Sequence, residues 1–330
     1  MRALVMTAPS QTSDRTEVRD LPTPRPGAGE VTIDVTHAGI NFIDVMARRG
    51  DPGYATSWPY VPGKEVAGIV REVGEGVEGL VPGQRVAAFT DRGGLAEVAP
   101  ARAALTAPVP DEVGLPAAAA APLMLATALL LLTDAAKFGP GETVLVHSAG
   151  GGVGSAVARL VPALGGGRLI GTVGRPDKTA AVRASGYDTV VARGGDLAEA
   201  VRAAAGGGVD VVLDPLGTTM LDLDLAITAP GGRIVLFGNA GGGEARPLPP
   251  AELMRRNIAV AGFSMSALSA TAPERAAAAL RRVLDLIAAG RLDVPVTEIG
   301  SLEEVPAVHQ LLADGRGEGK YVARVAAAGS

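Results

Sequence analysis

Apolar residues follow two different patterns along this chain of 330 residues, and the change comes near residue 125. Before it, short apolar runs are separated by turn sequences such as Pro24-Arg25-Pro26-Gly27 and Pro82-Gly83. Because short apolar runs with such punctuation are typical of β-strands, this part is predicted to be a compact, partly closed sheet domain. The runs are Ala3 to Met6, Val31 to Val35, Val66 to Val73 and Val86 to Phe89.

From Thr143 onward, strand-like runs alternate with helical runs about every 25 to 30 residues, which predicts βαβ units and a parallel sheet. Residues Ala276 to Ala289 are predicted to form an amphipathic helix that ends at Gly290. The tail from Val294 is predicted to return to strand and helix and to rejoin the first domain. Six strands fit the doubly wound fold that binds dinucleotides. They are placed at Thr143 to Val146, Arg168 to Val173, Thr189 to Val191, Val209 to Leu213, Gly232 to Phe237 and Ile258 to Gly262.

A glycine-rich turn joins the first of these strands to a helix. Ala149, Gly151 and Gly154 fit the dinucleotide pattern G-x-G-x-x-G, with alanine in the first glycine position. A small first residue permits the tight turn, the second position lets the backbone approach a pyrophosphate, and the third lets the helix pack against the strand. The helix is predicted to start near Val153, with its free N–H groups facing the phosphates. In a chain with 45 glycines, a flexible loop is the alternative.

The residue that ends the second strand distinguishes the two nicotinamide cofactors, because a carboxylate there binds the ribose hydroxyls of NAD. Here the position is Gly174, and Arg175 and Lys178 follow it on one short loop. Two positive charges could pair with the 2′-phosphate of NADPH, so the sequence favours NADPH as cofactor. Two alternatives stay open: Asp177 points inward, or both cations are merely solvated at the start of a helix.

Charge and composition exclude several classes of function. A net charge of −5 argues against a nucleic-acid partner held by phosphate contacts. The absence of cysteine excludes disulfides, thiolate zinc sites and cysteine nucleophiles. Val113 to Thr133 carries no charge, but Pro116 and Pro122 interrupt it, so a buried helix pair is predicted and no membrane partner is expected. The N-terminal segment lacks an apolar signal region, which indicates a cytoplasmic protein.

Several motifs carry a family resemblance. They are Gly39 to Asp44, Pro62 to Gly68, Val81 to Val86, His147 to Gly154, Gly171 to Gly174 and Phe237 to Asn239. Through them the chain resembles the medium-chain dehydrogenase/reductase superfamily, and within it the zinc-free quinone oxidoreductase branch that includes zeta-crystallin. The resemblance implies an α/β protein with a GroES-like, β-rich catalytic domain over 1–125 and 266–330 and a doubly wound Rossmann NADPH-binding domain with a six-stranded parallel sheet over 126–265. It also implies a homodimer that pairs the strands near Ile258.

The zinc-dependent alcohol dehydrogenases of the same superfamily provide a test for a metal. They hold their catalytic zinc with a Cys in the segment matching Ala38 to Asp44 and with a His in a Gly-His-Glu sequence. This chain has no Cys, and Lys64 stands in the His position, so no metal site is expected. For His147, beside the glycine turn, a structural hydrogen bond is expected. The histidines are isolated in the sequence and suggest no ligand set; they are His37, His147 and His309.

The resemblance implies catalytic roles for Asn41 and Thr127, and each has a structural alternative. Asn41 matches an Asn near the nicotinamide, where its amide could donate to the substrate oxygen; alternatively it stabilises a turn. Thr127 matches a Thr near the nicotinamide ribose or carboxamide; alternatively it is a buried helical Thr that bonds its own backbone.

Tyr54 and Lys64 are the other two candidate catalytic residues. Tyr54 lies in a loop expected to overhang the substrate cleft, where its phenol could donate; alternatively it packs against Trp58. Lys64 could direct its positive charge at a developing enolate; alternatively it pairs with a carboxylate such as Glu65 or Asp44.

The implied cofactor site combines the glycine turn with loops that leave the carboxyl ends of the strands. Two departures from the branch affect the site, because Met46 and the Ala192-Arg193 pair replace tyrosines that the branch often has there. Arg193 could add a third cation for the cofactor. The cofactor-binding residues are Asn41, Thr127, Ser148, Ala149, Gly150, Gly151, Gly152, Val153, Gly174, Arg175, Lys178, Leu216, Phe237, Gly238, Asn239 and Lys320.

Without a Lewis acid, simple alcohol oxidation is disfavoured, whereas a conjugated acceptor spreads its own negative charge. The predicted function is therefore a zinc-independent, NADPH-dependent oxidoreductase that transfers hydride to a small-molecule quinone or α,β-unsaturated carbonyl compound. One rival is a trans-acting enoyl reductase or tailoring enzyme on a polyketide-type intermediate, and a rival of another class is an NADPH-binding non-redox or structural protein. Docking of a carrier would favour a basic patch formed from Arg48, Arg49, Lys64 and Arg71.

Overall fold

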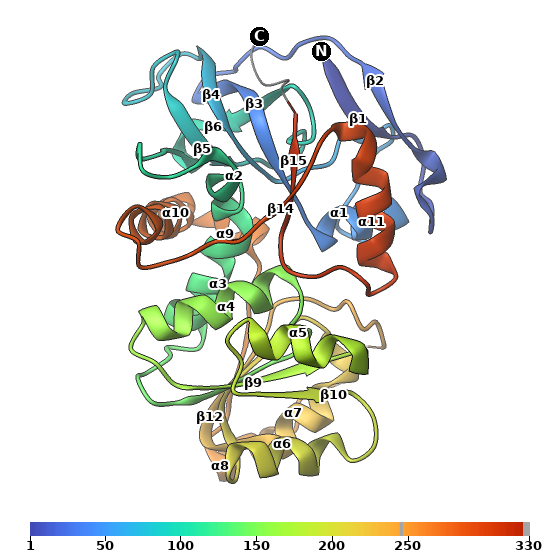
Figure 1. Cartoon of the computed structure of the whole chain (residues 1–330), viewed down its shortest axis with the longest axis vertical. Coiled ribbons are helices and arrows are strands. Elements are labelled where there is room, and N and C mark those ends of the chain that lie inside the picture. Colours follow the sequence, from blue (N-terminus) through green and yellow to red (C-terminus); the bar gives the residue numbers. More distant parts are fainter. Residues whose placement is uncertain (245–246, 326–330) are drawn as a thin grey trace. The chain divides into compact units, whose positions relative to one another are not determined.

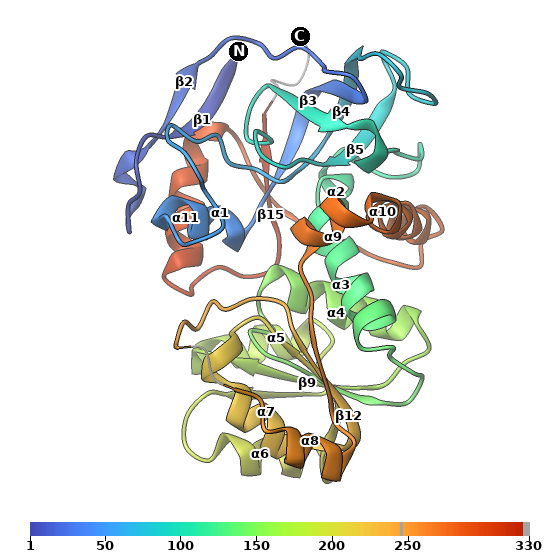
Figure 2. The same ribbon diagram turned by 180° about the vertical axis from the view of Figure 1, so that it is seen from behind.

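The computed structural model describes residues 1–244 and 247–325 (Figures 1 and 2). The chain forms two compact units: Met1–Ala126 with Ser266–Ser330, and Thr127–Met265. The second unit is therefore inserted into the first.

The first unit is built mainly from strands. Its seven-stranded sheet runs in the order β14-β15-β3-β4-β5-β7, with β6 paired to β3, and β1 and β2 form a separate antiparallel pair. The strands are β1 (Arg2–Met6), β2 (Thr16–Asp20), β3 (Glu30–Ile40), β4 (Glu65–Val73), β5 (Arg85–Phe89), β6 (Val98–Arg102), β7 (Thr106–Pro108), β14 (Thr297–Ile299) and β15 (Tyr321–Arg324).

The helices of the first unit cover this sheet and complete its core. Helices α1 and α11 lie side by side (Figure 2). In β3, the alternate residues Val31, Ile33 and Val35 are buried, as expected for a strand with one face on the core. The helices are α1 (Phe42–Arg49), α2 (Leu115–Ala118), α9 (Met265–Thr271), α10 (Pro273–Ala288) and α11 (Val305–Ala313).

The predicted apolar runs of the first unit are all strands, but three further strands were not predicted. Strand β2 has the sequence TEVRD, with most of its side chains exposed, and within the described residues it pairs with β1 alone. Strands β6 and β7 are short, and prolines interrupt their apolar pattern. Helix α10 and Gly290, which has a left-handed φ of 65°, agree with the predicted helix and its cap.

The second unit is a six-stranded parallel sheet in the order β10-β9-β8-β11-β12-β13. Helices α4 and α5 lie on one face of the sheet and α6, α7 and α8 on the other (Figure 1). The strands are β8 (Thr143–Val146), β9 (Arg168–Val173), β10 (Thr189–Ala192), β11 (Val209–Asp214), β12 (Thr228–Leu236) and β13 (Ala259–Gly262). The helices are α3 (Ala126–Leu130), α4 (Gly152–Ala163), α5 (Thr179–Ala184), α6 (Leu197–Ala205), α7 (Leu221–Ile227) and α8 (Pro250–Arg256).

These strands confirm the predicted doubly wound Rossmann sheet; most bounds agree within one residue, and one strand differs by more. Strand β12 begins at Thr228, whereas the apolar pattern predicted a start at Gly232. Pro230 and Gly231 interrupt that pattern, and the pairing of β11 with β12 shifts register there. A bulge of this kind hides the first part of a strand from a search for regular periodicity.

The uncharged segment 113–133 is helical and mostly buried, but it is not a simple helix pair. Two π-helical segments, Ala121–Leu125 and Leu131–Ala135, flank α3. No helix within residues 1–244 and 247–325 has the length and apolar character needed to cross a membrane.

Candidate cofactor and substrate site

The glycine turn between β8 and α4 has the geometry that its sequence predicts. Gly151 is the N-terminal cap of α4, which begins one residue before the predicted Val153. Ser148 has a left-handed φ of 55°, uncommon for a residue with a side chain, and its carbonyl accepts from Gly151 N at 2.9 Å. The first-turn N–H groups of α4 are thus presented where an anion can bind them.

Gly154 fixes the distance between α4 and the strand. A Cβ added there would lie 2.7 Å from the carbonyl carbon of Ala149, which backbone cannot accommodate. The carbonyl of Gly154 accepts a hydrogen bond from the buried Tyr187 hydroxyl at 2.8 Å. The third glycine of the motif is therefore required for packing, as the pattern predicts.

The two predicted cofactor-binding cations after β9, Arg175 and Lys178, lie in different surroundings. Arg175 makes two hydrogen bonds to Asp177, at 2.7 and 3.1 Å, and both side chains are largely exposed. The inward orientation considered for Asp177 is therefore wrong, and Arg175 already has a partner. Lys178 is buried, and its Cδ would lie 3.9 Å from a Cβ at Gly150, so its stem runs beside the glycine turn.

The loops that follow β11 and β12 are joined by hydrogen bonds. Asp214 accepts from the backbone N–H of Leu216 and Gly217 at 2.6 and 2.9 Å. The carbonyl of Leu216 accepts from Gly241 N, and Asn239 Oδ1 accepts from Thr218 N at 3.3 Å. The predicted cofactor residues Leu216, Phe237, Gly238 and Asn239 thus belong to one connected edge of the sheet, at its carboxyl end.

A buried His147–Asp224 pair supports this edge from within. His147 Nδ1 lies 2.8 Å from Thr172 Oγ1, and its Nε2 lies 2.8 Å from Asp224 Oδ1. Both side chains are fully buried, so the structural role expected for His147 is confirmed. Burial and the nearby Asp224 raise the pKa of Asp214 to about 7. Asp214 is recognisable from the sequence as a carboxylate at the end of a buried strand, where a loop toward the cofactor is expected, whereas no local signal points to Asp224.

In the first unit, Asn41 belongs to a buried charged cluster with Glu65 and Lys320. The Asn41 amide donates to Glu65 Oε1 at 3.0 Å and to Gly39 O at 3.3 Å, so the predicted donation to a substrate oxygen is not available in this arrangement. Lys320 Nζ donates to Ile40 O at 3.0 Å, to Asn41 Oδ1 at 2.8 Å and to Glu65 Oε1. These three acceptors satisfy an ammonium group, so Lys320 positions Asn41 and has no N–H left for a cofactor.

Asp44 and His309 extend the buried polar cluster. Asp44 accepts from Asn41 N at 2.9 Å and Gly63 N at 3.1 Å, and burial raises its pKa to about 6. His309 Nε2 lies 3.9 Å from Asp44 Oδ2, and burial together with the Arg48 charge lowers the pKa of His309 to about 3. His309 is therefore neutral at neutral pH and acts as a core residue.

Lys64 and Tyr54, the other two candidate catalytic residues, differ in their surroundings. Lys64 Nζ donates to Asp91 O at 2.7 Å, and burial lowers its pKa below the usual value. In the described part of the chain no carboxylate pairs with it, because Glu65 binds Lys320 instead. Tyr54 is half-buried against the apolar cluster that includes Trp58, and burial and Asp51 raise the pKa of its phenol.

Thr127, the first residue of the second unit, has a buried hydroxyl that lacks a partner. Its Oγ1 makes no hydrogen bond to any residue that the structure describes, so the alternative of a Thr bonded to its own backbone is wrong. Leaving a buried hydroxyl unpaired costs about 1 to 3 kcal/mol. An additional polar group is therefore expected at Thr127.

Two of the four cations that could form a basic patch for carrier docking have partners within the first unit. Arg48 is fully buried and donates to Gln11 O at 2.9 Å. Arg71 pairs with Asp34 at 2.9 Å.

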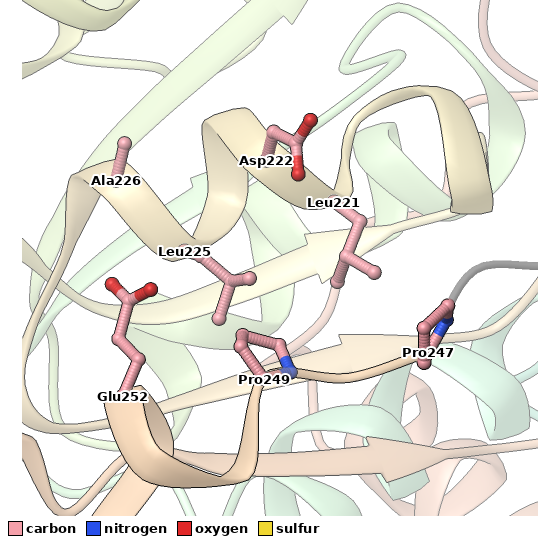
Figure 3. A pocket seen from close by; sticks show the side chains of 7 residues that line it. All are labelled: Leu221, Asp222, Leu225, Ala226, Pro247, Pro249 and Glu252. Carbon is pink, nitrogen blue, oxygen red and sulfur yellow. The ribbon is translucent and has the colours of Figure 1, made fainter. Parts of the chain in front are cut away.

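A cavity of about 340 Å³ lies elsewhere in the second unit, between α7 and α8 (Figure 3). Leu225 points toward Pro249 there, and Asp222 and Glu252 add two carboxylates (Figure 3). None of the predicted site residues lines this cavity, and its acidic groups would repel the phosphates of a dinucleotide. The glycine turn therefore stays the candidate for the cofactor site. Within residues 1–244 and 247–325, no three His, Cys, Asp or Glu side chains are grouped as a metal ion would require.

Comparisons with known proteins agree with the two units. A model of the alcohol dehydrogenase GroES-like domain matches residues 27–111, and a model of zinc-binding dehydrogenases matches residues 152–285. The chain is 32% identical over 318 residues to human synaptic vesicle membrane protein VAT-1 homolog-like, covering 91% of this chain and 75% of that protein. It is 32% identical over 249 residues to rat quinone oxidoreductase, covering 74% of each.

A much longer polyketide synthase protein and a solved structure are also similar to this chain. Spectinabilin polyketide synthase system protein NorB of Streptomyces orinoci is 36% identical over 297 residues, which are 89% of this chain but 13% of that protein. The structure of Escherichia coli quinone oxidoreductase complexed with NADPH superposes with a TM-score of 0.88 at 28% identity, covering 98% of this chain and 100% of that one.

A GroES-like sheet unit with an inserted Rossmann unit defines an oxidoreductase that binds a nicotinamide dinucleotide. The chain belongs to the medium-chain dehydrogenase/reductase superfamily, in its zinc-free, quinone oxidoreductase-like branch.

Proposed function

We propose that the protein is a zinc-independent reductase that uses NADPH to reduce a quinone or an α,β-unsaturated carbonyl compound. The observation that carries the proposal is Lys64, a half-buried cation with no carboxylate partner among the described residues. In the sequence it occupies the position that matches a metal-ligand His of the zinc-dependent alcohol dehydrogenases. When bound, NADPH supplies a hydride from its nicotinamide ring.

The residues of the second unit fit such a cofactor. The glycine turn presents the N-terminus of α4 for the pyrophosphate, and the stem of Lys178 runs beside that turn. Thr127 Oγ1 and Arg193 Nη1 are both buried without a partner in the described part of the chain, so each lacks a polar group that a dinucleotide could provide. No acidic residue ends β9, which supports NADPH over NADH.

Lys64 and Asn41 have separate roles in the proposed chemistry. Reduction of a conjugated acceptor places negative charge on the substrate oxygen, and a fixed cation lowers the energy of that charge most where water is excluded. Lys64 has two ammonium hydrogens beyond the one given to Asp91 O. Asn41 has a positioning role, because its hydrogen bonds to Glu65 and Lys320 fix the orientation of its side chain.

Lys64→Met is expected to lower kcat/KM for the best acceptor by about 100-fold, because one charge-stabilising donor is removed. Since burial lowers the pKa of Lys64, the wild-type rate should fall at alkaline pH below the range of an ordinary lysine, and this fall should be absent from the variant. The measurement is a pH profile of initial rates. Lys137→Met, at an exposed lysine, is the matched control, and an unchanged rate in Lys64→Met would contradict the role of Lys64.

The second candidate function is reduction of an enoyl thioester in polyketide assembly. It is supported by the similarity to NorB, which spans 89% of this chain. Initial rates of NADPH oxidation with a quinone, a short enone and an enoyl thioester separate the two candidates. A preference for the thioester would favour the second, and tight NADPH binding with no turnover on any acceptor would favour a non-redox role and contradict both.

We also propose that two copies of the chain associate through β13 in the cytoplasm. In the part of the chain that is described, β13 pairs with β12 alone, which leaves its other edge open. An open edge strand near Ile258 is suited to pair with its own copy. Sedimentation should give the mass of two chains, and the mass of one chain at micromolar concentration would contradict the dimer.

A further inference from the structure

The end of β9 is occupied by a side chain from the neighbouring strand. Arg193 follows β10, and its backbone N–H donates to Val173 O at 2.8 Å, which holds it beside the last residue of β9. Its guanidinium then lies over Gly174: a Cβ added at Gly174 would overlap with Arg193 Nη2. The place where a side chain at position 174 would stand is therefore filled by the positive end of Arg193.

This guanidinium is incompletely paired. Its Nη1 is buried and has no hydrogen-bond partner in residues 1–244 and 247–325. Burial lowers the pKa of Arg193, whereas the negative charge of Asp214 acts in the opposite direction. An arginine keeps its charge under these conditions, so a half-buried cation with an unused donor lies at the carboxyl end of the sheet.

The other cations of this edge are less suited to bind a new anion. Arg175 is already paired with Asp177 through two hydrogen bonds in an exposed position, where an ion pair contributes little. Lys178 runs beside the glycine turn rather than over Gly174. Arg193 thus differs from Arg175 in three ways: its guanidinium is partly buried, its Nη1 has no partner among the described residues, and it lies over Gly174 at the end of β9.

We propose that Arg193, and not Arg175, is the residue that selects NADPH by binding its 2′-phosphate, and that Gly174 is required because its missing side chain leaves room for the guanidinium. The proposal rests on NADPH being the cofactor, as proposed above. The choice of NADPH over NADH then depends on Arg193 and Gly174 together. The planar guanidinium of Arg193 presents its N–H donors in a fixed geometry that matches two phosphate oxygens.

The test measures binding and needs no turnover. NADPH and NADH, which differ by the 2′-phosphate, are titrated into the wild type and into Arg193→Leu, and reduced-nicotinamide fluorescence is followed. Arg193→Leu should raise the Kd for NADPH about 10- to 100-fold and change that for NADH less than about twofold. Calorimetry with 2′,5′-ADP, which has the 2′-phosphate and no nicotinamide, should show the same loss.

Three further variants make the result specific. Arg175→Leu is the matched control and should leave both Kd values within about twofold, since its charge is paired and exposed. Arg193→Lys should restore part of the NADPH affinity. Gly174→Ala keeps the charge but displaces the guanidinium, and because the backbone there is not left-handed, it should fold and still weaken NADPH selectively.

Several outcomes would overturn the assignment. These are an equal loss of NADPH and NADH affinity in Arg193→Leu, an unchanged ratio of the two, or a selective loss in Arg175→Leu. Equal binding of both cofactors by the wild type would contradict the choice of NADPH as well. Selective binding without reduction of any acceptor would leave the role of Arg193 supported and contradict the proposed reductase function.

Discussion

Lys320→Met is expected to lower the free energy of unfolding by about 3 to 5 kcal/mol, because it leaves the buried carboxylate of Glu65 without its cation. Lys320 and Glu65 are 3% and 0% exposed, so water cannot replace the lost partner. The change also removes the donor that fixes Asn41 Oδ1. Urea unfolding of the isolated protein measures the effect.

Two further variants separate charge from packing in this cluster. Lys137→Met removes an exposed lysine and should change stability by less than about 0.5 kcal/mol. Adding Glu65→Gln to Lys320→Met removes the unpaired charge and should recover part of the loss, which a double-mutant cycle quantifies. A loss below about 1 kcal/mol for Lys320→Met would contradict a buried, mutually dependent pair.

Gly154→Ala is expected to weaken NADPH and NADH binding alike by about tenfold or more, and to destabilise the protein by about 1 to 3 kcal/mol. The added Cβ would overlap with the backbone of Ala149, and neither α4 nor the turn can move without disturbing the other. Kd values from nicotinamide fluorescence and the free energy of unfolding test both parts.

Gly139→Ala in the same unit is the matched control. There an added Cβ lies 3.6 Å from the Glu142 carboxyl group, which is ordinary contact with a flexible side chain. Cofactor affinity should stay within about twofold of the wild type. Unchanged affinity in Gly154→Ala would show that the glycine turn is not the dinucleotide site.

The sequence predicted best what is encoded locally. The parallel sheet and the glycine turn are recognisable because strand, turn and helix signals follow one another along the chain, and Gly154 belongs to that pattern. The pairing of Arg175 with Asp177 is equally local, because the two residues lie two positions apart, and that spacing itself indicates a partner for Arg175.

Contacts between distant segments could not be predicted in this way. Lys320 and Glu65 are 255 residues apart, and neither residue carries a sign of its partner. From the sequence alone, Glu65 is available as a partner for its neighbour Lys64 and Lys320 for the cofactor, whereas in the structure Lys320 and Glu65 pair with each other. Arg193 meets Gly174 because β10 lies beside β9, and the register of these strands is a property of the folded sheet.

The most direct test of the proposed function is the initial rate of NADPH oxidation with a quinone, a short enone and an enoyl thioester, measured on protein treated with a strong metal chelator. We expect rapid oxidation with at least one of these acceptors and the same rate in treated and untreated protein. A rate that is lost with the chelator and restored by zinc would contradict a zinc-independent reductase, and so would the absence of oxidation with every acceptor.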